Sequence, residues 1–321
     1  MSTHLLKNLL LVFALGACAS PSRVNKETVK SDPVDNSAQP VIPVDQLPKS
    51  MMDLPQTQYG GFVLSPGFYE AEFKTYCLQP GTPDPRPRDA YLQSPVTGYR
   101  KDIIESVLIN SREHPQMDQK NIQLLLWSVV SGSDFNKLSS SVRSDAMRLL
   151  TSKQIFELNG GVIGLVKTVS NTTGILNANR DMKRLFEMST SSYENFERLA
   201  VLNEPSQIKR TGVKADKWYK QKENYFVRYF PVSYKKVRIQ VYVPDSLMDA
   251  EGKVNGEHVV FDPTGQEAIP AFTNAQRLGI GAPVADIVRV IIQVSKDANN
   301  KKRTPKEERK DLPKSKQGPS Y

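Results

Sequence analysis

The hydrophobic pattern of this chain changes its period twice, and this change restricts the possible folds most strongly. In "YEAEFKTYC", residues 69–77, apolar and polar side chains alternate, as is typical of a half-buried strand. From about residue 99 to 201 the spacing becomes helical, and alternation returns after 220. We therefore expect an α+β fold. It combines a helical segment of four to five helices (about 99–201) with a small antiparallel sheet (about 62–78 and 220–270).

Apolar stripes define the predicted helices. The spacing of i, i+3 and i+4 recurs in two clear runs, and His114-Pro115 separates them. Asp118 is placed to cap the second helix. The stripes consist of Ile103, Ile104, Val107 and Leu108, and of Ile122, Leu125, Leu126, Val129 and Val130.

The predicted strands after residue 220 are marked by alternation and by a turn. "KVRIQVYV" places four β-branched residues on one face, and Asn255-Gly256 is a strong hairpin signal. Residues 79–95 contain five prolines and are predicted to be an irregular loop. Two domain organisations are open, depending on whether the early strand (about 62–78) joins the strands at 220–270 in one sheet. Residues 59–295 form either one globular α+β domain or a helical part (99–201) followed by a β part (220–282).

The first 17 residues have the features of a secretory signal. Lys7 precedes an apolar run from Leu9 to Ala17, and the run ends in small residues. At about nine residues this run is shorter than the roughly 20 that span a bilayer. We expect residues 1–17 to be removed.

The end of this signal, Leu15-Gly16-Ala17-Cys18, resembles the lipobox of bacterial lipoproteins. The resemblance covers residues 1–20 only, and Gly16 is a less usual residue at its position. It implies that Cys18 becomes the acylated first residue of the mature chain, with palmitate among its acyl groups. Ala19 at the second mature position implies sorting to the outer membrane, with the protein facing the periplasm.

The segment after Cys18 is predicted to be a linker. Residues 18–58 contain six prolines and little hydrophobic periodicity. With Cys18 acylated, Cys77 has no partner in the chain for a disulfide. Its place on the apolar face of the 69–77 strand favours a buried, inert thiol over a redox or intermolecular role.

The C-terminal residues 296–321 hold nine Lys or Arg and four Asp or Glu, which is typical of a disordered basic tail. Two roles remain open: a solubilising tail, or contacts with lipid headgroups, anionic wall polymer or an acidic partner. No nucleic acid is expected as a partner. The candidate contact residues are Lys301, Lys302, Arg303, Lys306, Arg309 and Lys310.

Few residues are spaced for catalysis. The chain has three histidines and no zinc-binding, nucleophile-elbow or phosphate-loop motif, so no metal or cofactor is expected. Glu70 and Glu72 are the best candidates for a glycosidase carboxylate pair, although a solvated strand face explains them more simply. His258, beside a Val-Val-Phe strand, is interpreted as a structural residue.

These features predict a non-enzymatic lipoprotein of the outer membrane that faces the periplasm. It would act as a scaffold or accessory subunit of a cell-envelope assembly, such as a secretion, pilus, flagellar or polysaccharide-export machine. A peptidoglycan- or glycan-binding module is the main alternative. "NKLSSSVRSDAMRLL" is similar to the peptidoglycan-binding helix of the OmpA-like family but departs from its spacing. A cell-wall glycan hydrolase is the less favoured enzymatic alternative.

Overall fold

The computed structural model describes residues 39–42, 45–160, 173–188, 191–208, 215–285 and 291–292. The predicted signal, Cys18 and the candidate tail contacts from Lys301 to Lys310 lie outside these residues.

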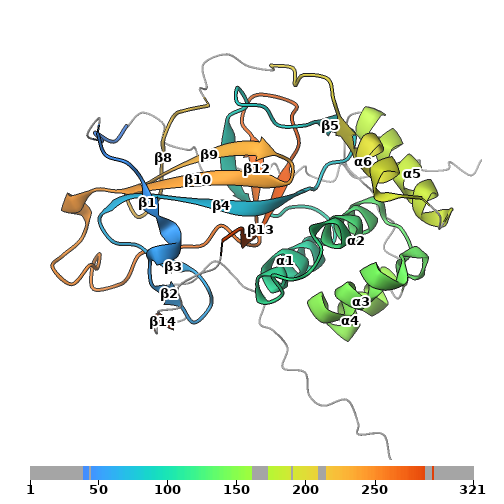
Figure 1. Cartoon of the computed structure of the whole chain (residues 1–321), viewed down its shortest axis with the longest axis horizontal. Coiled ribbons are helices and arrows are strands. Elements are labelled where there is room, and N and C mark those ends of the chain that lie inside the picture. Colours follow the sequence, from blue (N-terminus) through green and yellow to red (C-terminus); the bar gives the residue numbers. More distant parts are fainter. Residues whose placement is uncertain are drawn as a thin grey trace, which may run out of the picture. The chain divides into compact units, whose positions relative to one another are not determined.

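An antiparallel sheet that closes on itself forms the centre of the fold (Figure 1). Going around it, each strand pairs with the next, and the last strand, β13, pairs back with β4. All six of these pairings are antiparallel. The strands in order are β4 (Gly67–Cys77), β10 (Lys236–Val243), β9 (Phe226–Ser233), β6 (Tyr91–Pro95), β12 (Gln266–Pro270) and β13 (Leu278–Pro283).

This closed barrel corrects the predicted fold class. The expected combination of a helical segment of four to five helices with a small antiparallel sheet is wrong, because strands from both sides of the helical segment join in one six-stranded barrel. The predicted pairing between the 68–78 strand and the later strands is present, since β4 runs antiparallel to β10 from Gly67 to Lys74. The alternation in β10 is also confirmed: Val237, Ile239, Val241 and Val243 are all buried.

The predicted irregular loop at 79–95 is the main source of the error. Its last five residues form β6, which pairs with β12 along its whole length and with β9 at Tyr91 and Tyr229. The prolines lie mostly before the strand, and Pro95 is its last residue, where a missing N–H is tolerated. Thr82–Pro83 forms a further short strand, β5, parallel to β7 (Val201–Leu202).

The last part of the predicted linker is also folded. Residues 49–57 contain β1 (Lys49–Ser50), the short 3-10 helix η1 (Met51–Asp53) and β2 (Gln56–Thr57). Met51 and Met52 are buried in the main core. The linker prediction is therefore wrong for these residues. A second small sheet has the order β11 (Val260–Phe261), β3 (Phe62–Val63), β2 and β14 (Ile291–Ile292).

The turns of the chain follow the residues that permit them. Asn255 and Gly256 have φ of 54° and 81°, which is the conformation of the predicted tight turn. The remaining short elements are the strand β8 (Tyr219–Lys220) and three 3-10 helices: η2 (Ser111–Glu113), η3 (Phe135–Lys137) and η4 (Asp245–Leu247).

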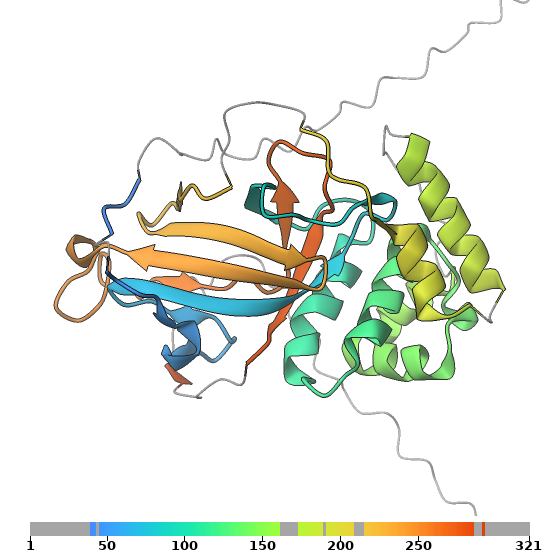
Figure 2. The same ribbon diagram turned by 45° about the horizontal axis from the view of Figure 1, so that its top comes forward.

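Helices lie beside one end of the barrel strands, as Figure 2 shows. The predicted stripes are confirmed, because Ile103, Ile104, Leu125 and Leu126 are buried. Asp118 caps α2 as predicted, accepting a hydrogen bond from the Lys120 amide at 2.9 Å. The described helices are α1 (Lys101–Asn110), α2 (Gln119–Ser131), α3 (Ser140–Leu149), α4 (Ser152–Leu158), α5 (Thr173–Glu187) and α6 (Tyr193–Ala200).

One continuous core joins the barrel, the second sheet and the helices. Helix α1 packs against β13 and α2 against β4. Among the helices in the described ranges, none has both the length and the apolarity needed to cross a bilayer.

Candidate functional site: the junction between barrel and helices

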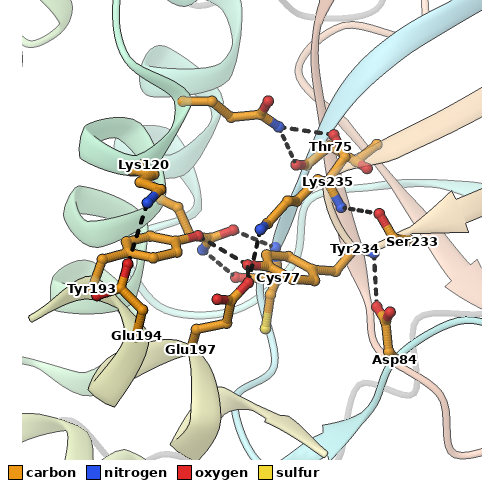
Figure 3. A network of polar contacts seen from close by, with 12 residues as sticks. Thr75, Cys77, Asp84, Lys120, Tyr193, Glu194, Glu197, Ser233, Tyr234 and Lys235 are labelled. Atoms are coloured by element: carbon orange, nitrogen blue, oxygen red, sulfur yellow. Dashed lines mark hydrogen bonds and ion pairs between the residues drawn. The ribbon is translucent and has the colours of Figure 1, made fainter. Parts of the chain in front are cut away.

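A network of polar contacts lies where the turn between β9 and β10 meets α2 and α6 (Figure 3). Tyr234 and Lys235 come from this turn, and Tyr193 and Glu197 from α6. These four residues are here called the junction cluster. The tight turn between two alternating strands places Tyr234 and Lys235 beyond the strand ends, where they reach the helices.

Tyr234 is the centre of the junction cluster and is 4% exposed. Its hydroxyl donates a short hydrogen bond to a carboxylate oxygen of Glu197 and lies 2.9 Å from the hydroxyl of Tyr193. Its backbone N–H donates to Oδ1 of Asp84 at 2.8 Å. One residue of the barrel thus binds both α6 and the segment that follows β4.

Lys235 and Glu197 form the ion pair of the cluster, with Nζ and Oε1 2.8 Å apart. Burial alone would raise the pKa of the Glu197 carboxyl, but the hydrogen bonds from Lys235 and Tyr234 outweigh it and hold the pKa below its ordinary value. Glu197 is therefore a carboxylate at neutral pH. Because its side chain is 30% and that of Lys235 45% exposed, solvent screens part of their attraction.

Aromatic rings cover the buried side of the cluster. The ring of Trp127 in α2 lies 5.6 Å from that of Tyr193 and 6.4 Å from that of Tyr234. On the other side the Lys120 ammonium lies 5.0 Å from the Tyr193 ring centre and pairs with Glu194 at 3.3 Å. Contacts between tilted aromatic rings and a cation–π contact therefore add to the hydrogen bonds.

Two glutamines of α2 bind the backbone next to this cluster. Gln123 receives the Cys77 N–H at 2.8 Å and donates to the Cys77 carbonyl at 3.0 Å. Gln119 donates to the carbonyls of Thr75 and Lys235 at 3.1 and 2.8 Å. These amides hold α2 against β4 where the strand leaves the barrel.

Cys77 lies on the buried face, as the alternation predicted. Burial raises the pKa of its thiol to about 12, so the reactive thiolate is scarce at neutral pH.

The groups of the junction cluster are suited to holding parts of the protein together. Burial raises the pKa of the Tyr193 and Tyr234 phenols far above their ordinary value, so both keep their protons at neutral pH. General acid–base catalysis favours a pKa near the operating pH, which neither the phenols nor the Cys77 thiol has. The cluster connects the hairpin, α2 and α6 into one body.

The candidate carboxylates Glu70 and Glu72 lie elsewhere, on β4 opposite β10. Glu72 pairs with Lys236 at 2.9 Å, and Glu70 lies 3.6 Å from Nε of Arg238. Glu70 also accepts a hydrogen bond from Gln240. Both carboxylates thus belong to a row of cross-strand pairs. Together with residues of β1 they also border a shallow pocket of about 300 Å³.

We expect Glu70→Gln and Glu72→Gln to change stability by less than about 1 kcal/mol each, because exposed ion pairs contribute little. Urea unfolding of each variant measures this, with Asp249→Asn in an exposed turn as the matched control. Loss of activity on wall polymer in either variant, with folding unchanged, would contradict the view that these carboxylates act as strand partners.

Several residues of the site were not predicted from the sequence. No motif or spacing singles out Tyr193, Tyr234 or Glu197, and the one usable signal is the break between the strands "YFPVS" and "KVRIQ". His258 is half-buried before β11, outside the junction cluster. Within the described residues, no group of His, Cys, Asp and Glu side chains is arranged to hold a metal ion.

Comparison with protein-family models finds no match, and neither does comparison with curated proteins or with solved structures.

Proposed function

We propose that this protein is a lipid-anchored, non-enzymatic scaffold or accessory subunit of an assembly in the bacterial cell envelope. The observation that carries this proposal is the sequence Leu15-Gly16-Ala17-Cys18 at the end of an N-terminal signal. An acylated Cys18 holds the mature chain at the outer membrane, on its periplasmic face. Multiple acyl chains give stable anchoring, since each buried methylene contributes about 0.8 kcal/mol.

The geometry supports a scaffold because the junction cluster and a further buried contact join parts of the protein to each other. The junction cluster fixes α6 to the barrel, and Asp89, 1% exposed, accepts a hydrogen bond from Ser206 at 2.5 Å. A barrel and a helical layer held in one arrangement present fixed surfaces to a partner, which lowers the ordering cost of binding.

Replacement of Cys18 by Ser is expected to release the protein from the membrane fraction, because the acylated side chain is lost. Fractionation and labelling with a clickable palmitate analogue measure this in cells, and Ser20→Ala is the matched control. A Cys18→Ser protein that stays membrane-bound and is still acylated would overturn the proposed anchor.

The scaffold role is tested by crosslinking in intact cells. We expect the wild-type chain to give defined adducts with envelope proteins that Cys18→Ser loses. Co-sedimentation with purified sacculi in place of protein adducts would instead favour the glycan-binding module.

A further inference from the structure

A groove of about 480 Å³ lies between α5 and α6. It is distinct from the junction cluster, although α6 contributes to both. Its lining residues are Asp181, Arg184, Leu185, Asn195, Arg198 and Leu199.

Helical periodicity explains how the groove forms. Asp181, Arg184 and Leu185 on α5 are spaced i, i+3 and i+4, and Asn195, Arg198 and Leu199 on α6 repeat this spacing. Residues with this spacing share one helix face. Each helix therefore brings one leucine and one arginine to the same groove.

The two helices are held together below the groove by a separate set of contacts. Phe186 and Phe196, both 4% exposed, have ring centres 4.4 Å apart. Helices α5 and α6 both pack against α2. Leu185 and Leu199 are only partly buried at the edge of this core, so they offer an apolar floor that a further element can cover.

The rim of the groove is positively charged. Arg180 and Arg184 share the single carboxylate of Asp181, at 3.9 and 3.5 Å. Arg198 is held by the amide oxygen of Asn195 at 2.6 Å and has no acidic partner among the residues the structure describes. Among the lining residues, two arginines stand against one aspartate, which favours an acidic occupant.

We propose that this groove binds an amphipathic helix of a partner protein, with aliphatic anchors flanked by acidic residues. A helix packs its side-chain ridges into the groove between two neighbouring helices. It binds such a groove with apolar anchor side chains at positions i, i+3, i+4 and i+7. Met188 follows α5 directly and is 61% exposed, which places an adaptable apolar side chain near the end of that helix. The chain's own residues 296–321 are a poor occupant, because they are strongly basic.

The test uses the full-length chain in detergent and three short synthetic helices. One carries leucines at the anchor spacing with flanking glutamates, the second replaces the glutamates with lysines, and the third replaces the leucines with serines. Fluorescence anisotropy measures their binding. We expect only the acidic leucine peptide to bind, with an affinity that falls as the salt concentration rises.

The variant Arg184→Glu combined with Arg198→Glu is expected to weaken this binding about tenfold or more and to favour the lysine peptide. Both side chains are exposed, so the fold should be kept, as an unchanged thermal midpoint would show. The single variant Arg184→Glu should also weaken binding, and Lys183→Glu is its matched control, because it makes the same charge change on the opposite face of α5.

Three results would overturn the proposal: no binding of the acidic leucine peptide, equal binding of the acidic and lysine peptides, or an equal loss with Lys183→Glu. Self-association that the double variant abolishes would also overturn it and assign the groove to a second copy. The inference uses the proposed function only to place the partner in the envelope. Failure of the peptide test leaves the Cys18→Ser result unaffected, so the two are tested separately.

Discussion

Replacing Arg277 with Met is expected to destabilise the protein by about 3–5 kcal/mol, because it leaves a buried carboxylate without its counter-charge. The side chain of Glu267 in β12 is 2% exposed and is bound by the Arg277 guanidinium. Arg277 also donates to the Thr97 hydroxyl at 2.7 Å. The pair thus ties β12, β13 and the end of β6 together, and urea unfolding measures its loss.

The loss of folding stability in Arg277→Met should depend on pH. Burial raises the pKa of Glu267, and Arg277 partly offsets this, so the variant raises that pKa further. A carboxyl whose pKa is higher in the folded than in the unfolded state contributes stability below its unfolded pKa and loses it as the pH rises through the folded pKa. The loss of stability relative to wild type is therefore largest at neutral pH and above, and becomes smaller in mild acid.

The matched control is Arg277→Met combined with Glu267→Gln. With no charge left to bury, this double variant should recover most of the lost stability and show little pH dependence. A single variant as stable as wild type across the pH range would contradict the importance of this pair for barrel closure.

Replacing Tyr234 with Ala is expected to cost about 3–5 kcal/mol, as for other buried aromatic residues. The change removes the ring beside Trp127 and the hydroxyl that binds Glu197 and Tyr193. Tyr234→Phe keeps the ring and should cost only about 1.5–3 kcal/mol. Thermal or urea unfolding measures both.

Hydrogen exchange shows whether the junction cluster acts locally. In Tyr234→Phe the amides of α6 should exchange faster than in wild type, while those of β4 and β10 keep their relative protection. Equal loss of protection in α6 and in the barrel strands would indicate that the hydroxyl stabilises the whole fold and not specifically its attachment to the helices.

The sequence predicted the parts of this fold that depend on local pattern. The alternation of β4 and β10, the stripes of α1 and α2, and the Asp118 cap follow from the spacing of neighbouring residues. Barrel closure could not be predicted in this way, because β6, β12 and β13 are short and contain Pro or Gly. Their assignment rests on pairing with distant strands, which alternation within a strand does not reveal.

The same limit applies to the junction cluster and to the N-terminal boundary of the folded region. Tyr193 and Tyr234 lie 41 positions apart in the chain, and only the fold brings them together. Met51 and Met52 stand in a proline-rich stretch without periodicity, so their burial depends on a 3-10 turn capped by Ser50. Glu70 and Glu72 were visible in the sequence because they share a strand face, and the structure gives each a cationic partner.

The pairing of β4 with β13 has a consequence for how the chain reaches its final compartment. Cys77 pairs with Leu278, about 200 residues further along the chain, and contacts of such separation form slowly. A chain exported from its N-terminus, as the predicted signal implies, would present β4 long before its partner strand has emerged. Until then the edge of β4 lacks its partner and is exposed to aggregation. For the envelope location proposed above, we therefore expect export to depend on periplasmic chaperones that shield unpaired strands.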